Sequence, residues 1–212
     1  MQNFRMILSQ HLKNYSIIYL FMIILFLSGI IFGAVIVNSM NFVQKEDLFF
    51  YLERFFNYTI EEQAVDKFTL FKESFFFHLK YLALLFVLGL SIIGLPIIWI
   101  LLFIKGLVVG FSVGFIVKQL GSEGLLFSAV SIAPHNFIVI PIYIFAGSLA
   151  MIFALALLKK IFSKGSAFTL WQPFFNYMIS FSIMIIFSIG AAVLESYVSN
   201  GAMQYLIKSF YL

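Results

Sequence analysis

The feature that most constrains this chain is a series of apolar runs at or near the length needed to cross a membrane. A spanning helix needs about 20 mostly apolar residues, and such runs form helices because lipid leaves backbone polar groups no other partner. Only 10% of the residues are charged and 63% are hydrophobic, whereas soluble domains carry about 25% charged residues. The sequence therefore predicts an all-α, polytopic integral membrane protein, a single membrane domain over residues 1–212. About five transmembrane helices are expected, at residues 17–37, 81–93, 97–117, 125–158 and 174–194.

Prolines interrupt these runs. Pro96 disfavours helical geometry at the residue before it, so the chain is expected to kink or turn there. The run of residues 125–158 is too long for one crossing. It predicts a half-helix, a break at Pro134-His135-Asn136 that could be re-entrant, and then the fourth spanning helix. One alternative stays open, in which residues 81–104 form a single kinked helix and residues 106–118 a short re-entrant piece.

Charges in the connections predict the orientation. Residues 1–16 and 159–173 contain basic side chains and no acidic ones, whereas residues 38–80 contain seven acidic and five basic residues. Because Lys and Arg accumulate in cytoplasmic loops, the first two segments are expected inside and the 38–80 loop outside. Five crossings then place the tail of residues 195–212 outside.

The outer loop has an amphipathic helical pattern. Apolar residues recur at three- and four-residue spacings from Lys45 to Phe56, and Thr59-Ile60-Glu61-Glu62 has the pattern of a capping box that starts a second helix. Two interpretations stay open. The aromatic faces lie in the headgroup layer or on the bundle, or they form a docking surface for another protein. The candidate docking residues are Phe49, Leu52, Phe55, Phe56, Phe68 and Phe71.

Glycines at four-residue spacing mark two helix faces. Gly106, Gly110 and Gly114 share one face of the third expected span, and Gly29 and Gly33 share a face of the first. Small residues with this spacing let helices approach closely in lipid. The two faces are expected to pack within the monomer or against another membrane subunit, a second copy of this chain being one candidate.

Few ionisable residues fall within the apolar runs. Lys105 and His135 do, Glu195 follows the last run, and Asn136 lies beside His135. His135 and Asn136 could satisfy the backbone groups that a helix break exposes at membrane depth. The alternative is a polar site for a proton, an ion or a substrate, as broken helices form in transporters. The protein would then be a transport or permease-like subunit using Lys105 and the Pro134-His135 break.

Signatures of catalysis and of cofactor binding are missing from the sequence. It has no Walker A run, no HExxH pattern and no cysteine, and its three histidines, at positions 11, 78 and 135, lie far apart. Lys and Arg are scattered, whereas a nucleic-acid-binding surface needs them clustered. We expect no enzymatic activity, no catalytic residue, no metal or other cofactor, and no nucleic-acid partner.

Four stretches of the sequence are informative when taken together. They are residues 38–52, which begin Asn38-Ser39 and continue through Lys45-Glu46-Asp47-Leu48; Ile93-Gly94-Leu95-Pro96; Lys105-Gly106 through Gly114-Phe115; and Pro134-His135-Asn136 followed by Pro141. In length and order they resemble the stage II sporulation protein M family of endospore-forming bacteria. The resemblance covers most of the chain.

The resemblance implies a multi-pass cell-membrane protein required for engulfment, in which the mother-cell membrane migrates around the forespore. It also implies a scaffold without hydrolase activity that localises two peptidoglycan-degrading proteins, stage II sporulation proteins D and P, on the mother-cell side of the septum. The expected partners are therefore membrane lipid and these two proteins. More distant relatives often have Pro-His-Gly followed by Glu where this chain has Asn136 and Val139, so no polar-site function is carried over from them.

Overall fold

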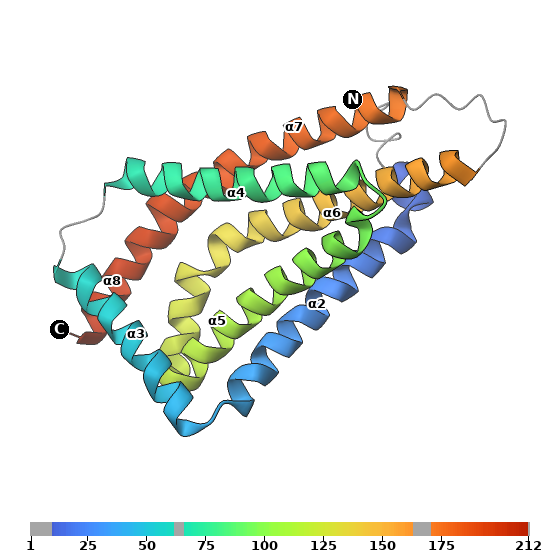
Figure 1. The fold of residues 1–212 in the computed structure, drawn as a ribbon. Coiled ribbons are helices and arrows are strands. Elements are labelled where there is room, and N and C mark those ends of the chain that lie inside the picture. Colours follow the sequence, from blue (N-terminus) through green and yellow to red (C-terminus); the bar gives the residue numbers. More distant parts are fainter. Residues whose placement is uncertain (1–9, 62–65, 163–170, 212) are drawn as a thin grey trace.

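The computed structural model describes residues 10–61, 66–162 and 171–211, and it confirms the expected all-α fold (Figure 1). Residues 10–14 are helical. The elements that follow are α2 (Ser16–Ser39), α3 (Phe42–Glu61), α4 (Lys67–Gly89), α5 (Gly94–Ser131), α6 (Ala133–Phe162), α7 (Trp171–Val193), the π-helix η1 (Leu194–Ser199) and α8 (Asn200–Tyr211).

Five helices run between two opposite ends of the bundle. In Figure 1 the start of α2, the α4–α5 turn, the end of α6 and the start of α7 lie at one end. The helices α3 and α8, the start of α4 and the α5–α6 junction lie at the other. Lys159 and Lys160 are in the last turn of α6, at the first end. Following the bias of basic residues toward the cytoplasm, we name the first end the inner end and the second the outer end.

Four helical stretches in the described part of the chain are long and apolar enough to cross a membrane: Ser16–Ser39, Gly94–Ser131, Ala133–Phe162 and Trp171–Ser209. The fifth helix, α4, differs because every 18-residue stretch of it contains Lys72, Glu73 and Lys80. Of the expected span of residues 81–93, residues 81–89 are the apolar end of α4, which begins at Lys67, and residues 90–93 form the turn after it. α4 still packs along α6 and α7, with Leu82 and Leu85 fully buried.

The helices of the outer loop begin at other residues than the sequence pattern suggested. The backbone N–H of Asn41 donates to the Gln44 side chain and the backbone N–H of Gln44 to the Asn41 side chain, a reciprocal pair that caps α3. Asp66 caps α4 by accepting from the Phe68 N–H. Thr59 lies in the last turn of α3 and so does not start a helix. Glu62, the end of that expected capping box, lies outside the described residues.

The chain turns back at residues 90–93. α4 ends at Gly89 and α5 begins at Gly94, where an added Cβ would overlap the Leu88 carbonyl group. Pro96 lies in the first turn of α5, where a missing N–H leaves no helical hydrogen bond unmade. α5 then continues to Gly121. The alternative of one helix over residues 81–104 with a separate piece at 106–118 is therefore wrong.

The path from α5 to α6 contains three interruptions. Gly121 has φ +60° and ψ −129°, a conformation that favours glycine, and it divides a long from a short part of α5. The helix stops again at Ile132, so the break falls just before the expected Pro134-His135-Asn136, and Pro134 lies in the first turn of α6. Pro141 lies inside α6, and Figure 1 shows α6 bending along its outer part.

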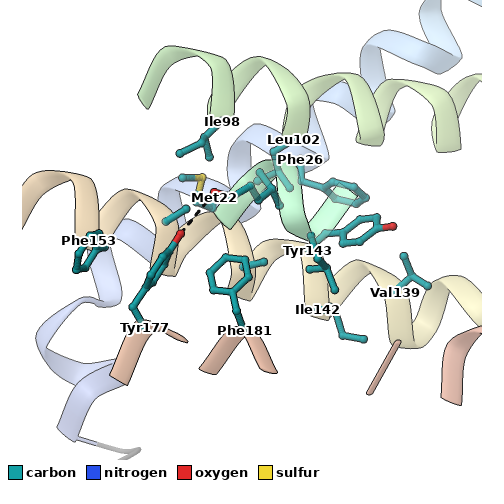
Figure 2. Packing of buried hydrophobic residues seen from close by; sticks show 14 of the residues in the cluster. Met22, Phe26, Ile98, Leu102, Val139, Ile142, Tyr143, Phe153, Tyr177 and Phe181 are labelled. Atoms are coloured by element: carbon teal, nitrogen blue, oxygen red, sulfur yellow. Dashed lines mark hydrogen bonds between the residues drawn. The ribbon is translucent and has the colours of Figure 1, made fainter. Parts of the chain in front are cut away.

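Two apolar clusters hold the helices together. The larger draws on α2, α4, α5, α6 and α7 and includes Met22, Phe26, Leu85, Ile98, Leu102, Phe153, Tyr177 and Phe181 (Figure 2). The smaller joins Phe56 of α3, Ile116 and Phe127 of α5, and Ile207 of α8. The smaller cluster therefore attaches α3 and α8 to the outer end of the bundle.

Candidate functional site

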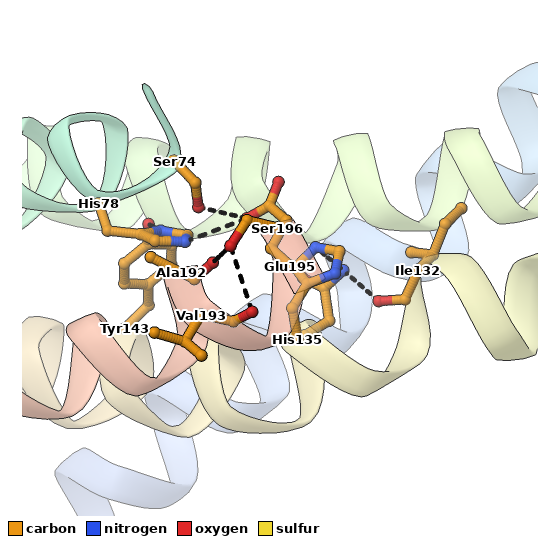
Figure 3. A network of polar contacts seen from close by, with 10 residues as sticks. Ser74, His78, Ile132, His135, Tyr143, Ala192, Val193, Glu195 and Ser196 are labelled. Carbon is orange, nitrogen blue, oxygen red and sulfur yellow. Dashed lines mark hydrogen bonds and ion pairs between the residues drawn. The ribbon is translucent and has the colours of Figure 1, made fainter. Parts of the chain in front are cut away.

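Polar side chains of α4, α6 and η1 meet inside the bundle (Figure 3), and Lys105 of α5 lies beside them. We call them the polar cluster. Its members are Ser74 and His78 of α4, Lys105 of α5, His135 and Tyr143 of α6, and Glu195 of η1.

His78 is the centre of the polar cluster. Its side chain is only 4% exposed, and its Nε2 lies 3.5 Å from Oε2 of Glu195. Its Nδ1 lies 2.6 Å from the Tyr143 hydroxyl. The Nε2 edge of the ring therefore faces the Glu195 carboxylate, and the Nδ1 edge faces the Tyr143 hydroxyl. The imidazole thus connects a fully buried phenol to the cluster's carboxylate.

Glu195 is the one acidic member of the polar cluster. Its side chain is 40% exposed, and its Oε2 accepts a 2.6 Å hydrogen bond from the Ser74 hydroxyl. It also interacts electrostatically with Lys105 and with His135. One carboxylate therefore contacts Ser74 and His78 and lies within electrostatic range of Lys105 and His135.

The π-helix η1 sets the position of Glu195. π-Helical turns are rare and often occur at functional sites. Ser196, the next residue, is buried and donates to the carbonyl oxygens of Ala192 at 2.9 Å and Val193 at 3.3 Å (Figure 3). These bonds hold the junction of α7 with η1, where the chain turns Glu195 toward α4.

Lys105 and His135 occupy different surroundings. The Lys105 Nζ lies 5.0 Å from the centre of the Phe77 ring and 5.2 Å from that of Tyr143, a cation–π arrangement in place of an ion pair. His135 Nε2 lies 3.1 Å from the side-chain nitrogen of Asn136. Asn136 also donates to the Ile132 carbonyl oxygen at 2.8 Å, so it satisfies a backbone group at the helix break.

The five expected glycines lie on one interface within the monomer, between α2 and α5. A Cβ added at Gly29 would overlap the Phe103 carbonyl oxygen, and one at Gly33 that of Leu107. On α5, a Cβ added at Gly106 would likewise overlap the carbonyl oxygen of Phe26, and one at Gly110 that of Ile30. Gly114 faces Ala34 at an ordinary contact distance of 3.4 Å. Both glycine faces are therefore occupied by helices of this chain.

The candidate docking residues divide by burial. Phe56 is 1% exposed and packs in the smaller cluster with Leu52 beside it, so neither presents a free aromatic or aliphatic face. Phe49 and Phe71 are partly buried, whereas Phe55 and Phe68 are exposed. Two aromatic residues outside the expected set, Phe50 and Tyr51, are 56% and 65% exposed on α3.

Sequence reasoning found part of the polar cluster. Lys105, His135 and Glu195 were singled out, and the structure brings them together around Glu195. Ser74, His78 and Tyr143 were missed as members. The spacing of Ser74 and His78, four residues apart, could have placed both on one helix face, but their segment was expected to lie in the outer loop. In the described residues no group of three or more His, Asp or Glu side chains could hold a metal ion.

Comparison with known proteins identifies the family. A family model described as stage II sporulation protein M matches residues 22–200, which include all but the first and last parts of the chain. Comparisons with curated proteins and with solved structures find no match. The matched region contains the polar cluster and the α2–α5 interface. The chain therefore belongs to the stage II sporulation protein M family and is a sporulation membrane protein.

Proposed function

We propose that this protein is a non-enzymatic membrane scaffold required for engulfment during endospore formation. It recruits the peptidoglycan-degrading stage II sporulation proteins D and P to the septal membrane, on the mother-cell side. The observation that carries the proposal is the family match over residues 22–200. The structure supports the proposal in that α3 lies at the outer end of the bundle (Figure 1), the end that the bias of basic residues toward the cytoplasm would turn toward the cell wall.

The docking surface that we propose is the outward side of α3. Phe56 anchors this helix to α8 and α5 through the smaller cluster, so the opposite side faces away from the protein. That side presents Phe50 and Tyr51, whose rings meet at 6.3 Å, with Arg54 stacked over Phe50. Exposed aromatic residues with an adjacent arginine are the residue types that dominate binding energy at protein interfaces.

The first experiment is a mild-detergent purification of the tagged protein from sporulating cells, with mass spectrometry of the proteins that co-purify. Proteins D and P are expected with the unmodified chain. The double variant Phe50→Ala, Tyr51→Ala is expected to reduce their recovery at least tenfold, since losing hot-spot residues costs about 2 kcal/mol each.

The matched control removes two equally exposed aromatic rings from the lipid-facing side of α7. Phe175 and Phe187 are 48% and 62% exposed, and their replacement by alanine should leave recovery of both hydrolases unchanged. If the α3 variant is recovered at the normal level with both hydrolases, these aromatic residues are anchors in the lipid headgroup layer, and the docking surface lies elsewhere.

The transport alternative has one observation in its favour, because Lys105 and His135 do lie near Glu195. Among the described residues, the polar contacts continue inward from His78 to Tyr143 and, by ring contact at 4.2 Å, to Tyr81. Beyond these residues, the described part of the inner half is filled by the larger apolar cluster (Figure 2). A scaffold is the function that this arrangement supports better.

Lys105→Met separates the two functions. Methionine keeps the length of the side chain and removes a charge that is costly inside a membrane, so a scaffold should fold, insert and retain its partners at normal levels. Sporulation efficiency and co-purification of the hydrolases measure this, with Lys118→Met on the exposed side of α5 as control. Loss of small-molecule flux with the complex intact would favour transport.

A further inference from the structure

A cavity of about 310 Å³ opens at the outer end of the bundle, where α4, the α5–α6 junction, η1 and α8 meet. It is lined by Leu70, Glu73, Ser74, Ser131, His135, Glu195, Ser196, Ser199, Asn200 and Met203. Ser131 and Ser199 are 7% and 3% exposed, and neither hydroxyl has a hydrogen-bond partner among the residues that the structure describes. Buried hydroxyls without partners are uncommon and require an explanation such as a ligand or a bound water.

The charge of the lining selects a cation. Two carboxylates, those of Glu73 and Glu195, line the cavity together with the imidazole of His135, and none of its described lining residues is a lysine or an arginine. A metal ion is not favoured, because no suitable group of acidic and histidine side chains exists in the described residues. A primary ammonium fits better, since it carries three N–H donors. Ser131 and Ser199 line the same cavity as the Glu195 carboxylate, so a rotation of each buried hydroxyl toward the cavity would give the ammonium three acceptors.

A second hollow adjoins this cavity along α4. It is lined by Thr69, Lys72, Glu73, Phe76, Phe77 and Lys80, so Glu73 borders both spaces. The two lysines offer positive charge for an anion beside the ammonium site. Phe76 and Phe77 are 49% and 57% exposed and continue the hollow with an apolar surface. A ligand that matches both spaces has an ammonium, an adjacent anion and an apolar tail.

We propose that this junction binds the headgroup of an aminophospholipid, phosphatidylethanolamine. Its primary ammonium lies in the cavity against Glu195, Ser131 and Ser199. Its phosphate, two carbons away, lies toward Lys72 and Lys80, and its acyl chains pass over Phe76 and Phe77. The site is independent of hydrolase recruitment. It lies at the outer end of the bundle, which the bias of basic residues toward the cytoplasm places toward the outer leaflet.

The test compares two lipids that differ only in the ammonium. The purified full-length protein is titrated in detergent with phosphatidylethanolamine or with phosphatidylcholine of the same acyl chains, and thermal unfolding is followed. Ligand that binds the folded protein raises Tm with concentration. Phosphatidylcholine has the same phosphate and the same net charge but no N–H donor. We expect that about tenfold more of it is needed for the same rise in Tm, because charge-assisted hydrogen bonds are lost.

The double variant Ser131→Ala, Ser199→Ala tests the cavity itself. Because neither hydroxyl bonds within the protein, the variant should fold with an unchanged Tm in the absence of lipid. Its preference for phosphatidylethanolamine should fall to less than threefold. Glu195→Gln should lower the preference in the same way, and Lys72→Gln with Lys80→Gln should weaken both lipids equally. Glu53→Gln, on the exposed side of α3, is the control and should keep the preference.

Three outcomes would overturn the proposal. Equal stabilisation by the two lipids would mean that water satisfies the two hydroxyls. An unchanged lipid preference in the double serine variant would place the ammonium elsewhere. Displacement of phosphatidylethanolamine by Nα-acetyl-lysine methylamide at equal concentration would show that the cavity takes a lysine side chain, and hence a protein, in preference to a lipid.

Discussion

Replacing Gly110 with leucine is expected to prevent α2 from packing on α5 and to destabilise the folded protein by about 3 kcal/mol, the upper end of the usual cost of overpacking. The reason is geometric. A Cβ at residue 110 would overlap the carbonyl oxygen of Ile30, and this oxygen belongs to a helix backbone that cannot turn aside. The two helices would have to separate along their whole shared length, because Gly29, Gly33 and Gly106 make the same kind of contact.

The measurement is unfolding of the purified protein in mixed micelles, with the amount of inserted protein followed in membranes. Gly190→Leu is the matched control. Gly190 lies in α7, is exposed, and has no atom within 4 Å of an added Cβ, so leucine there should leave stability within about 0.5 kcal/mol of the unmodified chain. A Gly110→Leu variant as stable as the Gly190→Leu variant would contradict the packing of α2 on α5.

The α2–α5 interface shows which part of the helix packing can be predicted from the sequence. Four-residue spacing is enough to identify glycine faces on the helices that contain Gly29 and Gly110, because the helical repeat places such residues in one row. The spacing says nothing about which helix occupies the face. Packing in lipid depends on backbone approach, and many helices can make that approach. The pairing of α2 with α5 therefore became known only from the structure.

The polar cluster shows what could not be predicted from the sequence. The sequence predicts an outer-loop position for His78 because Lys72, Glu73 and Lys80 interrupt the apolar pattern, and hydropathy alone ends a span at such charges. In the structure α4 is one helix from Lys67, and the register of its packing turns His78 inward. Its contact with Glu195 also depends on the π-helical turn of η1, and no simple periodicity in the sequence marks that turn.

His78 is expected to be the residue of the polar cluster that contributes most to stability. Replacement by leucine keeps much of the volume but leaves the Tyr143 hydroxyl, in a residue only 1% exposed, without its partner. An unsatisfied buried polar group costs about 1–3 kcal/mol, and the lost pairing with Glu195 adds to this. Because the Glu195 side chain is 40% exposed, water replaces part of that pairing. We expect a total loss of about 2–3 kcal/mol in the free energy of unfolding.

A double-mutant cycle separates the hydrogen bond from general packing. Tyr143→Phe alone should cost about 1 kcal/mol, and His78→Leu combined with Tyr143→Phe should cost less than the sum of the two single changes by about 1 kcal/mol, since no orphaned hydroxyl remains. Tyr177→Phe is the control. Its hydroxyl donates to the Phe86 carbonyl oxygen at 3.0 Å, in another part of the core, so its cost should simply add to that of His78→Leu. Additive costs for His78 and Tyr143 as well would mean that the 2.6 Å contact does not stabilise the fold. The polar cluster would then contribute to the cavity at Glu195 but not to the packing of α4 against α6.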